Sequence, residues 1–272
     1  RLRAHLPVLP PPAQLAPDPA PARTPAAGLP PGGQPTLSVP TAPQLAGLLL
    51  LAGWVGADTT AALQIMVSQP LVAGWLGGWV MGEPALGLAV GLVLQVVWGR
   101  AYALGGASFP VVGPAALAAG GMAALAAPRS SAWGALRLPD AASLAAVLAG
   151  ALLSAELGRA LVMWKRRHRI GLVRRACAAV EAGSPRGVQL ANFTGALQSV
   201  VLGMVLAGVG LLAGSFALAL AGRVPVADGR WVALAVLGVG LGHTVTLVEK
   251  RGRGLAWLLV TLAGAAAGWA LR

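Results

Sequence analysis

A few polar side chains interrupt an otherwise apolar chain, and chemistry is expected at these residues. They are Asp58, Gln64, Gln95, Glu156, Arg159, Asn192, Gln198 and His243. A polar group facing the middle of a bilayer is costly, so each is a functional candidate by default. The competing interpretation is a hydrogen bond between helices, which contributes about 0.6 kcal/mol on average.

Spacing separates these candidates into pairs. Glu156 and Arg159 are three residues apart and share a helix face, so they are predicted to neutralise each other. Asp58 and Gln64 are six apart and do not share a face on a continuous helix. They converge if the helix breaks near Gly56.

The remaining candidates lie near the ends of apolar segments. Asn192 and Gln198 are typical of the entry to a long span, and His243 precedes the basic residue Lys250 and is predicted at the membrane interface. The sequence contains no nucleophile elbow, zinc-protease motif or phosphate loop, and no cluster of acids for a metal. Cys177 stands alone, which excludes an intrachain disulfide. We therefore expect no catalytic residue, cofactor or metal.

Composition explains why polar groups are so few. Of 272 residues, 57% are hydrophobic and 10% are charged, with a mean hydropathy of +0.74. A soluble domain carries about 25% charged residues. The chain is predicted to be a polytopic membrane protein rather than a soluble enzyme, a secreted disulfide scaffold or a disordered regulator. Its net charge of +12 comes from short segments between apolar runs, which argues against a nucleic-acid partner.

The apolar segments predict an all-α fold of about six to eight membrane segments, since a span needs roughly 20 apolar residues. They cover 45–57, 61–82, 84–99, 111–127, 141–163, 194–221, 231–248 and 254–271. The segments 45–57, 84–99 and 111–127 are short and interrupted by Gly or Pro. Such segments are typical of re-entrant or broken helices that line substrate sites.

Two domains are predicted. Residues 1–43 hold 13 of the 21 prolines and are predicted to be a disordered tail, because proline blocks helix propagation. Residues 44–272 are predicted to form the membrane-embedded domain.

Two basic clusters predict the orientation. Six Lys or Arg residues lie within 165–175, and a second cluster begins at Lys250, two spans later. Both clusters are expected on the cytoplasmic side, so 164–186 should face the cytoplasm. The first cluster, a basic loop, is interpreted as an orientation signal with an amphipathic helix on anionic lipid, or as a docking surface for a soluble partner.

The stretch from Asp58 to Ala116 resembles subunit IIC of the mannose/fructose/sorbose type of the bacterial sugar phosphotransferase system. The motifs that carry the resemblance are Gln69-Pro70-Leu71-Val72-Ala73-Gly74, Met81-Gly82-Glu83, Leu94-Gln95 and Gly105-Gly106-Ala107-Ser108-Phe109-Pro110. Three positions depart from the family pattern. Gln69 stands where the family has Arg, Gln95 replaces Glu, and Val111 replaces Asp, so all three changes remove charge.

The resemblance implies a permease domain in the bacterial inner membrane that conducts a sugar. It implies an IID-like membrane subunit and soluble IIB and IIA phosphocarriers as partners, with no phosphorylation site on this chain. The acid at the Gln95 position helps such proteins bind sugar hydroxyls, and an amide also donates and accepts hydrogen bonds. We predict that Asp58, Gln64, Gln95 and Asn192 bind substrate, with Gln64 and Gln95 as paired amides.

Two other functions are considered. A non-transporting interaction or regulatory protein would keep the fold and lose sugar binding, as the changes at Gln95 and Val111 suggest. An intramembrane enzyme has no group of residues in its favour.

Overall fold

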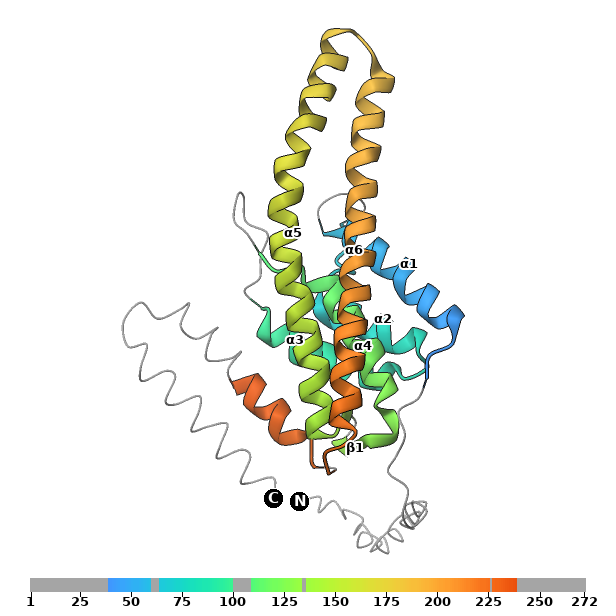
Figure 1. The fold of residues 1–272 in the computed structure, drawn as a ribbon, viewed down its shortest axis with the longest axis vertical. Helices are drawn as coiled ribbons and strands as arrows, with labels where there is room; N and C mark the ends of the chain where they lie inside the picture. Colours follow the sequence, from blue (N-terminus) through green and yellow to red (C-terminus); the bar gives the residue numbers. More distant parts are fainter. Residues whose placement is uncertain (1–38, 60–63, 100–108, 134–135, 226, 239–272) are drawn as a thin grey trace, which may run out of the picture. The chain divides into compact units, whose positions relative to one another are not determined.

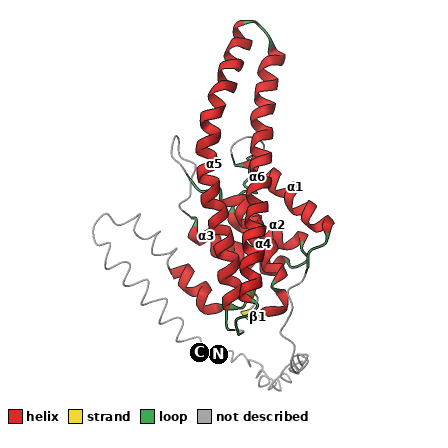
Figure 2. Ribbon diagram, viewed as in Figure 1, coloured by secondary structure: helices red, strands yellow, loops and turns green. Residues whose placement is uncertain are grey.

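The computed structural model describes residues 39–59, 64–99, 109–133, 136–225 and 227–238, and most of these residues are helical (Figure 2). The helices are α1 (Ala42–Asp58), α2 (Pro70–Val80), α3 (Pro84–Val97), α4 (Val112–Leu125), α5 (Ala141–Glu181) and α6 (Pro185–Ala221), and residues 230–238 are also helical. The all-α prediction is confirmed. An antiparallel pair of short strands, β1 (Ser130–Trp133) and β2 (Leu136–Pro139), was not predicted.

The first helix begins slightly before the predicted domain boundary. It starts at Ala42, so Pro43 lies in its first turn, where proline is tolerated. The Gln44 carboxamide oxygen accepts a hydrogen bond of 2.9 Å from the Thr41 N–H just before the helix. Residues 1–38 lie outside the described residues.

Helix α4 forms the centre of the fold. Every residue from Gly113 to Leu125 is buried, and α4 contacts α1, α2, α3, α5 and α6. Most of its residues are Ala or Gly, which lets neighbouring backbones approach closely, as is common for helices packed in lipid.

Glycines allow the closest approaches between the short helices. A Cβ atom at Gly74 of α2 would lie 2.7 Å from the Cα of Gly91 on α3. A Cβ at Gly120 of α4 would collide with the carbonyl oxygen of Gly74. These helices therefore pack backbone to backbone.

We expect Gly120→Ala to lower the free energy of unfolding by roughly 1–3 kcal/mol, because the added methyl group forces the α2 and α4 backbones apart. Gly171→Ala is the matched control, since Gly171 is also inside a helix but a Cβ there would meet no neighbouring atom within 4 Å. There, alanine should be neutral or stabilising by up to about 1 kcal/mol. Unfolding of both variants in detergent, followed by tryptophan fluorescence, tests this. Equal effects would contradict the close packing.

Helices α2 and α3 are too short to cross a bilayer. With 11 and 14 residues, at a rise of 1.5 Å per residue, they extend about 16 and 21 Å, against a hydrocarbon core of about 30 Å. The prediction of short, broken helices is confirmed. The segment 61–82 is not one span, because the chain is irregular over 64–69 and the helix begins only at Pro70.

Helices α5 and α6 are both long and apolar enough to cross a membrane, and they run side by side (Figure 1). The 41 residues of α5 extend about 60 Å, roughly twice the hydrocarbon thickness. The basic run 165–175 therefore lies on the same continuous helix as the apolar segment 141–163, and not in a loop with a separate amphipathic helix. Arg, Lys, Ala and Leu are good helix formers, and α6 packs alongside. The α5–α6 hairpin turns at Gly183, which has a positive φ of 62°.

Candidate functional site

Asp58 holds the irregular segment 64–69 in place. It is the last residue of α1 and only 2% exposed. Its carboxylate accepts hydrogen bonds from the backbone N–H of Ile65 at 2.7 Å and of Ser68 at 3.0 Å. Helix α1 continues through Gly56, so the break follows Asp58 and does not lie at Gly56.

Gln95 connects α3 to the N-terminal end of α2. Its Oε1 accepts a hydrogen bond from the backbone N–H of Leu71 at 3.2 Å, and its Nε2 donates to Oε1 of Gln69 at 3.3 Å. The amide that Gln95 contacts is therefore that of Gln69. The expected joint contact of Gln64 and Gln95 with a sugar stays a prediction. Gln64 is exposed and has a left-handed φ of 42°.

Several helix ends meet around the segment 64–69. This segment leads directly into the N-terminus of α2, and it also touches the N-terminal turn of α4, since a Cβ at Gly113 would lie 2.9 Å from the carbonyl oxygen of Ser68. Helix N-termini carry partial positive charge and favour electron-rich oxygen groups. Together with the Gln69–Gln95 amides, they form a polar region in an apolar bundle.

This region can bind polar ligands. Amide groups and backbone N–H groups bind hydroxyls through neutral hydrogen bonds. Among the described residues there is no group of three or more His, Cys, Asp or Glu side chains that could hold a metal ion. The chemistry that the region offers is recognition.

Asn192 lies apart from the other predicted site residues. It is exposed on α6 and lines a cavity of about 250 Å³ in the α5–α6 hairpin together with Arg169. The Glu156–Arg159 pair is confirmed, with 3.1 Å between Glu156 Oε2 and Arg159 Nε. His243 lies outside the described residues.

A buried ion pair that the sequence analysis missed connects the start of α5 with the end of α6. Arg129 Nε lies 2.8 Å from Asp140 Oδ2, and both side chains are 1% exposed. Arg129 also donates to the carbonyl oxygens of Val224, at 3.0 Å, and Ala221, at 3.5 Å. Asp140 is the N-cap of α5 and accepts from the hydroxyl of Ser143 at 2.6 Å.

Burial tends to raise the pKa of Asp140, but the hydrogen bonds from Arg129 and Ser143 and the charge of Arg129 hold this pKa below its ordinary value. An aspartate three residues before Ser143, at the start of an apolar run, is a recognisable N-cap signal. No local pattern identifies Arg129 as its partner.

Short glycine-packed helices around a polar break, beside two long apolar helices, make up the fold of an all-α membrane protein. Residues 44–241 match the family model of the PTS system sorbose-specific IIC component, and the chain belongs to this family.

A solved structure is similar in fold. It is the cryo-EM structure of the mannose transporter ManYZ in complex with microcin E492. The match has a TM-score of 0.54 at 17% sequence identity and covers 84% of this chain and 88% of the other. A search of curated proteins found no match.

Proposed function

We propose that this chain is the sugar-translocating subunit of a phosphoenolpyruvate-dependent phosphotransferase system in the bacterial inner membrane. It would act with an IID-like membrane subunit and with soluble IIA and IIB proteins, which would carry the phosphoryl group. Membership of the IIC family supports this proposal, and so does the similarity in fold to a mannose transporter.

The observation that carries the proposal is the Gln69–Gln95 amide pair at the N-terminus of α2. Each carboxamide has two N–H donors and an oxygen with two lone pairs. One N–H and one lone pair of Gln95 remain beyond its bonds to Gln69 and Leu71, and these would bind a sugar hydroxyl. We assign the recognition of the substrate to these two glutamines.

Asp58 would act by positioning. Both of its carboxylate oxygens accept backbone N–H groups of the segment 64–69, so it sets the path of the chain into α2. Gln64 stays a candidate for sugar contact from the same segment. The predicted contribution of Asn192 gains no support, because Asn192 lies on the α5–α6 hairpin and lines a cavity to which Gln69 and Gln95 do not contribute.

The two charge-removing replacements in this pair compensate each other. The resemblance places Arg at position 69 and Glu at position 95, and in this chain the two side chains are in contact as neutral amides. Replacement of only one would leave a charged side chain opposite a neutral amide, without its charged partner. The paired change keeps the connection between α2 and α3, which favours a retained site over a non-transporting protein.

Equilibrium binding of a sugar panel to the full chain, purified with its co-expressed IID-like subunit, tests the proposal. We expect at least one neutral hexose or related sugar to bind saturably to the complex. A folded complex that binds none of the panel would contradict the proposal and support the non-transporting alternative.

A further inference from the structure

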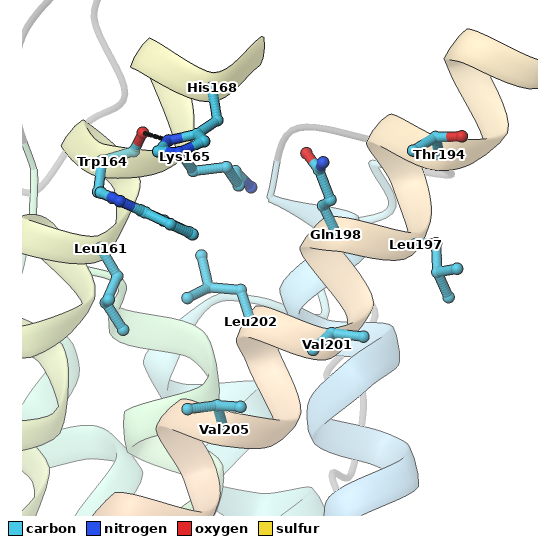
Figure 3. Close-up of a pocket in the computed structure, with 10 residues that line it drawn as sticks. All are labelled: Leu161, Trp164, Lys165, His168, Thr194, Leu197, Gln198, Val201, Leu202 and Val205. Atoms are coloured by element: carbon cyan, nitrogen blue, oxygen red, sulfur yellow. Dashed lines mark hydrogen bonds between the residues drawn. The ribbon is translucent and has the colours of Figure 1, made fainter. Parts of the chain in front are cut away.

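A groove with an apolar floor and a cationic rim lies between α5 and α6. It has a volume of about 460 Å³, within the range of about 300–1,000 Å³ that is common for ligand sites. Leu161, Leu202 and Val205 form part of its floor, and Lys165 and Gln198 extend into the gap between the two helices (Figure 3). Neither the amide pair at α2 nor the proposed sugar site contributes to it.

Two cations near the rim have only neutral partners. Lys165 Nζ donates to the hydroxyl of Ser199 at 3.1 Å, and Arg169 donates to the same hydroxyl at 3.0 Å and to the carbonyl oxygen of Gly195. Ser199 is 1% exposed. In the described part of the chain, neither Lys165 nor Arg169 forms an ion pair with an acid. The rim of the groove therefore carries an excess of positive charge.

The sequence supplies no acid nearby on the hairpin to balance this charge. Glu156 is already paired with Arg159. Glu181 is 16 residues beyond Lys165 on the same helix. At 1.5 Å per residue it lies about 24 Å away, more than twice the Debye length of about 10 Å at 0.1 M salt. The hairpin itself therefore offers no free acid close to these two cations.

The groove lies where the apolar segment 141–163 gives way to the basic run 165–175, which is the depth at which lipid headgroups meet basic side chains. A free phosphate would bind to the two cations but would leave the apolar floor uncovered. A purely apolar helix of a partner subunit would cover the floor but leave the cations unbalanced. A phospholipid with an anionic headgroup satisfies both parts.

We propose that this groove binds one anionic phospholipid, with an acyl chain along Leu161, Leu202 and Val205. Its phosphate would lie at Lys165, which lines the groove, and at Arg169, which lines the neighbouring cavity and shares the hydroxyl of Ser199 with Lys165. The indole of Trp164, 59% exposed, lies along the same groove (Figure 3). Its fluorescence therefore reports on what fills the floor.

The full chain, with and without its co-expressed IID-like subunit, is reconstituted into phosphatidylcholine bilayers. A small fraction of either phosphatidylglycerol or phosphatidylcholine carries brominated acyl chains, which quench tryptophan on contact. The contribution of Trp164 is the difference from a Trp164→Phe variant. We expect brominated phosphatidylglycerol to quench Trp164 at a much lower fraction than brominated phosphatidylcholine.

The charge variants make the proposal specific. Removal of both cations in Lys165→Gln/Arg169→Gln should weaken the preference for phosphatidylglycerol by roughly 25-fold, at about fivefold for each charge. In Lys165→Gln alone the preference for phosphatidylglycerol should fall about fivefold, and in Lys165→Arg it should be retained. The matched control is Arg174→Gln/Arg175→Gln, which removes two exposed charges from the same helix and should change the preference less than twofold.

Equal losses in the control and the Lys165/Arg169 variant would show a diffuse attraction to the basic hairpin and overturn the site. Quenching that disappears when the IID-like subunit is bound would also overturn it, because the groove would then be a protein interface. Quenching by both brominated lipids to the same extent would show contact without headgroup recognition, which equally contradicts the proposal.

Discussion

Arg129→Leu is expected to destabilise the protein by about 3–5 kcal/mol, because it leaves the carboxylate of Asp140 buried without its partner. It also removes the donors to the carbonyl oxygens of Val224 and Ala221 at the end of α6. Both effects act where α5 begins and α6 ends. The measurement is thermal or denaturant unfolding of the purified chain in detergent.

Arg137→Leu is a matched control for this loss. Arg137 forms an exposed ion pair of 3.2 Å with Glu83, and such pairs contribute only about 0–1 kcal/mol. The double variant Arg129→Leu/Asp140→Asn should recover much of the lost stability, since Asn still caps α5 and no charge stays buried. A loss of the same size for Arg129→Leu and Arg137→Leu would contradict the importance of burial.

The pH dependence of the Arg129→Leu deficit has a defined sign. In the native protein the folded pKa of Asp140 is below its ordinary value of 3.8, so its stabilisation is present above 3.8 and lost as the pH falls through the folded pKa. In Arg129→Leu, the pKa-raising effect of burial on Asp140 is opposed only by the hydrogen bonds from Ser143 and from the helix cap. The folded pKa of Asp140 therefore rises. The deficit should therefore be larger at pH 8 than at pH 5, and the reverse order would contradict the ion pair.

Gln95→Leu is expected to weaken sugar binding by roughly one to two powers of ten. The reason is that the variant removes the amide that we assign to a sugar hydroxyl, at about 1–3 kcal/mol, with about 1.4 kcal/mol per tenfold change in affinity. It also removes the acceptor of the Leu71 N–H, so its melting temperature should fall as well. Sugar affinity and melting temperature are both measured on the complex with the IID-like subunit.

Gln95→Glu separates recognition from structure. A carboxylate still accepts the Leu71 N–H, and negative charge at the N-terminus of α2 is favourable, so stability should be retained. A carboxylate at position 95 has no N–H group to replace Nε2, so it can only accept hydrogen bonds from Gln69 and from the sugar. The sugar preference should therefore change. An affinity unchanged in Gln95→Leu, with a lowered melting temperature, would reject the site and leave Gln95 with a purely structural role.

The sequence by itself determined the class of this protein. A chain with 57% hydrophobic residues and a 28-residue stretch without charge, 194–221, has to place that surface in lipid, where helices satisfy their own backbone groups. Pro84 and the glycines near it indicated short helices because these residues limit helix length locally. The Glu156–Arg159 pair was predicted because three-residue spacing places both side chains on one helix face.

The sequence predicted the ends of the helices less well than the class of the protein. The basic run 165–175 was expected to form a loop with a separate amphipathic helix because charge marks the end of a membrane span, but charge does not end a helix outside the hydrocarbon. The segment 61–82 was predicted as one span from its hydropathy. Hydropathy carries no information about backbone conformation, so it does not reveal a break in the helix. Residues 64–69 depart from the helix with positive φ at Gln64 and Met66, held by hydrogen bonds to Asp58.

Only the tertiary structure decided which polar groups meet. Gln69 and Gln95 are 26 residues apart, and their contact depends on the close approach of α2 and α3 at Gly74 and Gly91. Arg129 reaches the end of α6 across more than 90 residues of sequence. Periodicity reports which face of one helix is apolar, but a partner across the bundle is selected by packing, and packing is a property of several helices at once.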